Sequence, residues 1–292
     1  MKNASTSIRA QTVYELRREY KISELVKAAE ISRSTYYYHI KQMTKPDKYK
    51  AEKDAIRLIH AENNGRYGYR RITATLHQRG FHINHKTVRR LMKSLGIFCT
   101  VRIRKYSFYR VKCTEPPAPN LLKRDFRANK PNEKWVTDIT EISLCGQRLY
   151  FSPILDLYNG EIISYSISHR PKHCMIIDML EKAFAKIPDD SGLVLHSDQG
   201  WHYRIPAYMS MLTIKGIRQS MSRKGNCLDN AVMENFFGHM KSEVLYLQQF
   251  TSVESFIREL HKYIKYYNLH RIKSNLDYLS PVDYRLFNSL VA

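Results

Sequence analysis

Apolar residues in the first third of the chain recur three or four positions apart, which is the spacing of one helix face. Short polar turns divide this pattern, and we predict three short helices within residues 12–42. Their expected N-caps are Thr12, Ser23 and Ser32. Two helices joined by a short turn at residues 31–32 suit a helix-turn-helix, although an ordinary helical hairpin fits the pattern equally well.

A second helical unit is predicted after a short linker, with helices over residues 53–62 and 70–78 and a third from Asn84 to Gly96. The third helix has an apolar stripe on one side and basic residues around the other. Such a helix packs inward while its basic side faces phosphates. The candidate DNA contacts of this unit are Arg70, Arg71, Lys86, Arg89, Arg90 and Lys93.

The segment that follows is rich in basic and aromatic residues and is broken by prolines at positions 116, 117 and 119. Prolines disfavour both helix and central strand, so we predict an extended linker over residues 101–130. Its charge indicates that it follows a DNA backbone. The candidate DNA contacts here are Arg102, Arg104 and Lys105.

Beyond Pro131 the pattern changes to that of an α/β domain. Three β-rich runs separated by short turns predict an antiparallel meander, and helices then alternate with two further strands. The predicted strands are 135–142, 148–157, 161–167, 192–196 and 217–221, and the predicted helices are 173–187, 205–214, 228–243 and a last one over 253–267. This order matches an RNase-H-like layout.

The pattern therefore predicts an α/β, RNase-H-like core preceded by an all-α region. The expected domains are a helix-turn-helix-like segment over 1–45, a helical DNA-binding domain over 46–100, a basic linker over 101–130, and a catalytic core with C-terminal helices over 131–292.

Charge is distributed very unevenly over the 292 residues. Residues 1–130 contain 30 basic and 10 acidic side chains, whereas the remainder contains 18 and 17, so nearly all of the net charge of +21 lies in the first part. Such asymmetry is typical of a nucleic-acid-binding region joined to a near-neutral domain. No 18-residue apolar run or signal-peptide segment occurs, and the five cysteines form no C-x-x-C pair. These features predict a protein of a reducing cytoplasm, with no membrane partner.

Three carboxylates stand out by their position. Asp138 lies in the first predicted strand, Asp198 follows the fourth strand, and Glu234 lies on the long helix, with 35 residues between the last two. In an RNase-H-like layout all three converge, and oxygen-only ligands favour Mg²⁺ or Mn²⁺, here as two ions for phosphoryl transfer. Lys241 is seven positions after Glu234, on the same helix face. Each residue also has an ordinary alternative, as a strand end, a turn residue or a solvent-facing helix charge.

The blocks 135–140, 196–200 and 222–231, together with Glu234 and Lys241, resemble the DDE transposases of bacterial insertion sequences. They are most similar to the OrfB product of the family typified by insertion sequence three, whose core is similar to retroviral integrase. Residues 66–72, with the sequence RYGYRRI, resemble the helix-turn-helix of that family. Residues 266–268, Arg271 and residues 279–281 also fit, so the resemblance covers most of the chain.

The resemblance implies that Asp138, Asp198 and Glu234 bind Mg²⁺ or Mn²⁺ and that Lys241 is the basic residue of the catalytic site. It implies metal-dependent cleavage and strand transfer at insertion-sequence ends, that is, transposition through DNA recombination and integration. The expected partners are the terminal repeats and target DNA, an upstream OrfA product or a fusion with it, and further copies of the chain on DNA, near the bacterial nucleoid. No sustained heptad repeat occurs, so we expect the OrfB portion alone.

Two other functions remain open from the residues. The first is a non-catalytic, sequence-specific DNA-binding regulator that uses the basic region. The second is a plain RNase-H-type nuclease, although such an enzyme would not need the basic helical units.

Overall fold

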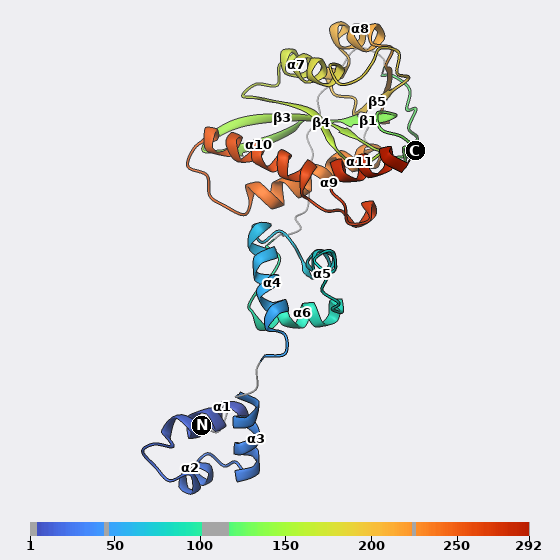
Figure 1. Cartoon of the computed structure of the whole chain (residues 1–292). Helices are drawn as coiled ribbons and strands as arrows, with labels where there is room; N and C mark the ends of the chain where they lie inside the picture. Colours follow the sequence, from blue (N-terminus) through green and yellow to red (C-terminus); the bar gives the residue numbers. More distant parts are fainter. Residues whose placement is uncertain (1–4, 44–46, 101–116, 224–225, 292) are drawn as a thin grey trace. The chain divides into compact units, whose positions relative to one another are not determined.

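The computed structural model describes residues 5–43, 47–100, 117–223 and 226–291 (Figure 1). The chain forms two compact units, Met1–Ala55 and Ile56–Ala292, and each is described by itself. None of the helices in the described ranges has both the length and the apolar character that a membrane crossing needs.

Three helices make up the first unit: α1 (Thr6–Leu16), α2 (Ile22–Ala28) and α3 (Arg33–Met43). They bury a small core of Ala10, Val13, Val26, Ala29 and Tyr36. The three predicted helices are therefore present, and the core is formed by the residues at helical spacing.

Of the three predicted N-caps in this unit, one is confirmed. The Ser32 hydroxyl accepts the Thr35 backbone N–H at 3.1 Å. The prediction for Thr12 was wrong, because α1 is capped by Ser5 and the Thr12 hydroxyl donates to the carbonyl of Ile8 inside the helix. The prediction of Ser23 as an N-cap was also wrong, since α2 already begins at Ile22. Both hydroxyl residues sit within a helix that starts earlier than the apolar spacing indicated.

The second unit begins with a helical part made of α4 (Lys50–Glu62, of which residues 50–55 belong to the first unit), α5 (Tyr69–Gln78) and α6 (His85–Ser94). Its buried side chains lie on the predicted apolar faces: Ile56, Ile59, Ile72, Leu76, Val88 and Leu91. Asn84 caps α6 by accepting the Lys86 N–H at 2.8 Å, and Gly96 follows the C-cap with a φ of 65°. Only a residue without Cβ adopts such a φ at no cost.

A six-stranded mixed sheet forms the centre of the rest of the unit. The strands are β1 (Lys134–Thr137), β2 (Thr140–Leu144), β3 (Gln147–Asp156), β4 (Ile162–Ser168), β5 (Val194–Ser197) and β6 (Arg218–Met221). The long strand β3 pairs antiparallel with β4 on one edge and with β2 and then β1 on the other. β1 pairs parallel with β5, and β5 parallel with β6. This is the predicted RNase-H-like order.

The predicted strand over 135–142 is in fact two strands, because the ladder breaks at Asp138 and Ile139. The Asp138 carboxylate accepts the Ile139 backbone N–H at 2.7 Å. That N–H is thereby taken by a side chain, and Asp138 is left at the carboxyl end of β1.

Helices cover both faces of the sheet (Figure 1). The helices α7 (His173–Phe184) and α8 (Pro206–Ile214) pack on one face around Trp135 and Leu195. The helices α9 (Ala231–Met240) and α10 (Val253–Leu269) pack on the other around Val136 and Phe151. Alternate residues of β1 thus enter opposite cores, as the period of a strand requires.

The predicted helix over 228–243 has three parts. A 3-10 turn, η2 (Cys227–Asn230), precedes α9, and a π-helical turn, η3 (Lys241–Leu245), follows it. The prediction of a last helix at 253–267 was incomplete, because α11 (Pro281–Val291) follows α10.

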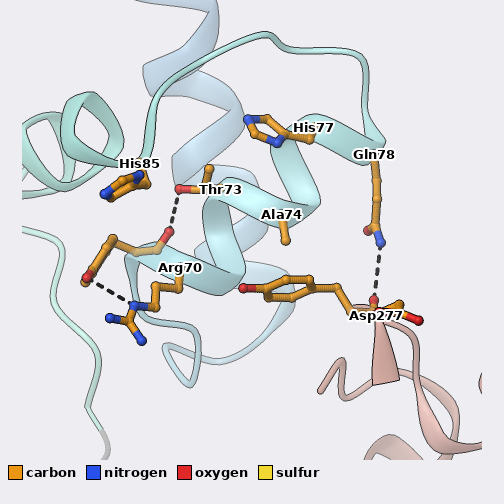
Figure 2. A pocket seen from close by; sticks show the side chains of 9 residues that line it. Arg70, Thr73, Ala74, His77, Gln78, His85 and Asp277 are labelled. Atoms are coloured by element: carbon orange, nitrogen blue, oxygen red, sulfur yellow. Dashed lines mark hydrogen bonds between the residues drawn. The ribbon is translucent and has the colours of Figure 1, made fainter. Parts of the chain in front are cut away.

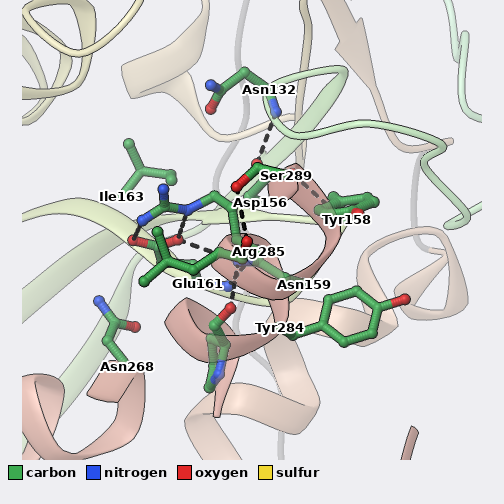
Figure 3. Close-up of polar contacts among 12 residues, drawn as sticks. Asn132, Asp156, Tyr158, Asn159, Glu161, Ile163, Asn268, Tyr284, Arg285 and Ser289 are labelled. Atoms are coloured by element: carbon green, nitrogen blue, oxygen red, sulfur yellow. Dashed lines mark hydrogen bonds and ion pairs between the residues drawn. The ribbon is translucent and has the colours of Figure 1, made fainter. Parts of the chain in front are cut away.

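Polar contacts attach α11 to the hairpin between β3 and β4 (Figure 3). Arg285 pairs with Glu161 at 2.8 Å, and Asn159 donates to the carbonyl of Pro281 at 2.8 Å. Next to them, the buried Asp156 accepts backbone N–H groups of Asn132 and Tyr158. Burial raises the pKa of Asp156 to about 6.

The C-terminal part of the predicted linker is not an extended spacer. Residues 117–127 lie against the core: Leu122 is buried, and the Leu121 N–H donates to the Ser220 hydroxyl at 2.9 Å. Arg124, part of the basic charge that we expected to follow DNA, donates to Asp229 at 2.8 Å instead.

Candidate active site and nucleic-acid interface

The parallel pairing of β1 and β5 aligns two of the predicted metal ligands. Val136 is opposite His196, and two residues further along each strand come Asp138 and Asp198. Because parallel strands in register end at the same edge of a sheet, the two aspartates lie side by side just beyond the strand ends. Both residues are half-buried.

The surroundings disfavour the charged form of both aspartates. Burial, and then the neighbouring Asp198, raise the pKa of Asp138 well above its usual value, while the Ile139 N–H and Lys241 act in the opposite direction. Burial also raises the pKa of Asp198, although the Gly200 N–H, which donates to its carboxylate at 2.8 Å, counteracts it. Two adjacent carboxylates repel each other when both are ionised, and a cation bound between them would stabilise the ionised forms.

Glu234 lies in the first turn of α9, which is attached to the end of β1. The Asn230 side-chain amide donates to the Thr137 carbonyl at 3.4 Å. Glu234 is half-buried, burial raises its pKa, and its charge contributes to the raised pKa of Asp138. Across the ranges that the structure describes, no three His, Cys, Asp or Glu side chains are drawn together as a metal-binding cluster. The metal-binding role of the three carboxylates therefore stays a prediction.

Lys241 directly follows α9 and opens the π-helical turn η3. Its amine is half-buried and acts electrostatically on Asp138. Burial lowers the pKa of Lys241, and the negative charges of Asp138 and Glu141 partly restore it. The basic group predicted for the site therefore lies within electrostatic range of Asp138.

A buried carboxylate that sequence reasoning missed supports this edge of the sheet. Asp229 is fully buried and accepts from Asn120, Arg124 and Arg223 at 2.8–3.0 Å. The Arg223 guanidinium, ahead of the opposing effect of burial, holds the pKa of Asp229 far below its usual range. Only the position of Asp229 within block 222–231 could have drawn attention to it.

His196 is a packed histidine. It is fully buried, and its ring nitrogens contact the Ser220 hydroxyl at 2.8 Å and the Asp229 carbonyl at 3.0 Å. These contacts bind β5 to β6 and to the turn η2 before α9, so His196 has a packing role.

The helix α6 presents the predicted basic surface. Val88, Leu91 and Met92 are buried. The basic residues Lys86, Arg89, Arg90 and Lys93 are exposed. This separation lets α6 pack inward and offer positive charge outward.

Arg70 is exposed beside an open cavity of about 550 Å³ (Figure 2). It donates to the Tyr69 hydroxyl at 3.2 Å, and the Tyr69 ring stacks on that of His85. On the far side of the cavity, Gln78 donates to the carbonyl of Tyr278 at 3.3 Å. A guanidinium next to aromatic rings is suited to nucleic acid.

Four predicted DNA contacts are not part of this exposed basic surface as the structure describes it: one is turned inward and three lie outside the described residues. Arg71 is half-buried, lies over the Tyr67 ring, and has its pKa lowered by burial and by Arg271. It therefore faces the protein interior rather than the basic surface. The other three, Arg102, Arg104 and Lys105, lie outside the described residues.

The chain is similar to transposases and integrases. Residues 48–106 match the HTH-like domain family, and residues 128–227 and 234–288 match two integrase core domain families. The putative transposase InsK of insertion sequence element IS150 from Escherichia coli K12 is 52% identical, over 93% of this chain and 95% of the relative. Transposase InsF of insertion sequence IS3A, from the same organism, is 31% identical over 90% and 93%.

Among solved structures, the HTLV-2 integrase catalytic core domain in complex with magnesium is 16% identical, with 55% of this chain and 99% of that one covered at a TM-score of 0.44. The sequence matches extend over nearly the full length of the transposase relatives. The chain therefore belongs to the insertion-sequence-three family of transposases, as an OrfB protein with an integrase core.

Proposed function

We propose that this transposase cleaves and joins DNA at the ends of its insertion sequence, with Asp138, Asp198 and Glu234 as ligands of divalent cations. The observation that carries the proposal is the shared register of β1 and β5, which puts two carboxylates of raised pKa side by side. Glu234 lies in the first turn of α9, whose preceding residue Asn230 is bonded to the end of β1, and its charge acts on Asp138.

The residues at this edge fit a Mg²⁺ or Mn²⁺ ion. The donors are carboxylate oxygens, which these hard cations prefer. The buried Asn230 side-chain oxygen has no hydrogen-bond partner among the described residues, so the site has unused acceptor capacity. Two bound cations would activate the attacking oxygen and stabilise the leaving one.

The chain's own side chains supply position and charge. The carboxylates of Asp138 and Asp198 would supply oxygen ligands to the cation at the ends of β1 and β5, and the Lys241 ammonium would offer a donor to a DNA phosphate beside them. Positioning and charge stabilisation account for most of the catalysis in phosphoryl transfer. No covalent enzyme intermediate is needed.

The basic face of α6 and Arg70 would hold the element ends by contacting phosphates. We further propose that the protein acts in the bacterial cytoplasm on nucleoid DNA, together with an upstream OrfA product or fused to it. More than one copy would assemble on the two ends of the element.

The test uses the full chain, alone and fused to the upstream reading frame, with labelled duplexes carrying the ends that flank the gene, in Mg²⁺ or Mn²⁺. We expect nicking and joining that Asp138→Asn and Glu234→Gln abolish without loss of DNA affinity. Asp178→Asn, at an exposed position on α7, is the matched control and should stay active. Turnover by Asp138→Asn would remove this residue from the metal site.

The same assay decides between the proposal and its alternatives. DNA binding without any cleavage, in the chain and the fusion alike, would make the protein a DNA-binding regulator. Cleavage without any joined product would make it a nuclease.

A further inference from the structure

The π-helical turn η3 connects the catalytic helix with the protein interior. It begins at Lys241, and Glu243 two residues later is buried, with 1% of its side chain exposed. A π-helical turn is wider than an α-helical one, and such turns are frequent at functional sites. The direction of the Lys241 side chain therefore depends on what holds this turn in place.

One of the groups that hold it comes from the helical DNA-binding part. Arg66, in the loop between α4 and α5, donates from Nε to the Glu243 backbone carbonyl at 3.1 Å. Its guanidinium lies over the rings of Tyr263 and Tyr266, at 5.5 and 4.9 Å. Arg66 is only 6% exposed, so this arginine of a basic region is committed to the protein rather than to DNA.

Neighbouring contacts give the same connection a defined geometry. The Tyr67 hydroxyl donates to the His270 carbonyl at 3.0 Å and accepts the Ile272 N–H at 3.2 Å. The Tyr266 hydroxyl donates to the Asn63 side chain at 3.3 Å. The loop before α5 is thus attached at several points to the C-terminal end of α10, and Arg66 extends from it to η3.

The DNA-facing residues belong to the same compact helical part as this loop. Arg70 follows Arg66 by four residues, and the core of α5 and α6 contains the buried side chains of Ile72, Leu76 and Val88. A displacement of the basic face of α6 is transmitted through a close-packed core, because such cores do not deform continuously.

From this juxtaposition we infer that Arg66 is a positioning residue for Lys241: its bond to the Glu243 carbonyl sets the turn η3 and thereby couples DNA binding by the helical part to the catalytic site. The inference rests on the proposed function. Arg66 itself touches neither DNA nor the carboxylates. Its effect on the reaction passes through the backbone of residues 241–243.

A double-mutant cycle in single-turnover cleavage tests the coupling. We expect Arg66→Ala to lower the rate constant about tenfold, the effect of losing one charge-assisted hydrogen bond, while the Kd for DNA stays unchanged. Arg66→Lys keeps a donor and should recover part of the rate. In a Lys241→Ala background, Arg66→Ala should cause no further loss, because its effect passes through Lys241.

Arg79→Ala is the matched control, since Arg79 lies in the same helical part and pairs with Glu62 at the surface. It should leave the rate unchanged. Independent, additive losses from Arg66→Ala and Lys241→Ala would overturn the inference, as would an equal loss in Arg79→Ala.

A second measurement needs no catalysis and so separates a failure of the inference from a failure of the proposed function. An amine-reactive reagent is applied to the folded full chain, and the labelling rate of each lysine is read by mass spectrometry. In Arg66→Ala, labelling of Lys241 should rise several-fold, while the exposed Lys182 and Lys262 stay constant. An unchanged Lys241 rate in a folded variant would overturn the inference, whether or not the wild type cleaves DNA.

Discussion

The ion pair between Glu243 and Arg271 offers a sharp test of how the second unit is stabilised. Arg271 donates to the Glu243 carboxylate at 2.6–3.1 Å. The side chain of Arg271 is 3% exposed and that of Glu243 is 1% exposed. Burial by itself would raise the pKa of Glu243, but Arg271 outweighs it and lowers this pKa. The Tyr263 hydroxyl also donates to the carboxylate, at 3.0 Å.

Arg271→Met removes the ion-pair partner and leaves the carboxylate with the Tyr263 hydroxyl and the electrostatic influence of Arg71. Breaking a buried pair in this way costs about 3–5 kcal/mol, because an uncompensated charge remains. For a unit of this size the melting temperature falls by roughly 2–4 °C per kcal/mol, so a decrease of roughly 6–20 °C is expected. Replacing both residues, as in Glu243→Met with Arg271→Met, removes the stranded charge and should restore most of the stability.

Differential scanning calorimetry of the full chain, with urea unfolding beside it, measures these effects. The matched control is Lys182→Met, which breaks an exposed pair with Asp178 and should cost less than about 1 kcal/mol. The reasoning is refuted when Arg271→Met is no more destabilising than this control. It also fails when the double variant is as unstable as the two single changes added together.

Three further outcomes are expected. Gly200→Ala should lower the cleavage rate on the order of 10–100-fold, because the new Cβ would lie 2.8 Å from the Asp198 carboxylate and displace it. The melting temperature should stay nearly unchanged, because alanine adopts the φ of this position freely. Cleavage at the wild-type rate would contradict this. The pKa of Asp156 is raised to about 6, so the folded state binds the Asp156 proton more tightly than the unfolded state does. Protonated Asp156 therefore adds about 3 kcal/mol to the free energy of unfolding below pH 4, and this contribution is lost as the pH rises through 6. Asp156→Asn should lack this loss in urea titrations at both pH values, and a parallel decrease would argue against it. DNA affinity should fall steeply with salt, with a log–log slope reduced by about 1 in Lys86→Ala; an unchanged slope would remove Lys86 from the phosphate contacts.

Local patterns in the sequence were enough for most helices and strands. Apolar spacing alone located the faces that become buried, and one of the three predicted N-caps of the first unit, Ser32, was correct. Asp198 was likewise visible as an acidic residue after an apolar run, whereas Asp138 was expected inside the first strand.

The destination of each charged side chain was decided by the tertiary structure. In the sequence, Arg66, Arg71 and Arg124 belong to the same basic region as the exposed arginines of α6. In the structure, each of the three turns toward the protein instead. For two of them the partner is more than 100 residues away: Asp229 for Arg124 and the Glu243 carbonyl for Arg66.

What the sequence by itself determined is therefore local: the helical and strand periodicity, the turns, the Ser32 cap and the end of the strand before Asp198. Only the tertiary structure decided the break of the first strand at Asp138, the docking of residues 117–127, and the pairing of Glu243 with Arg271. The physical reason is that burying a charge is unfavourable until a compensating group arrives. Which group arrives depends on how distant segments pack, and no local pattern along the chain records it.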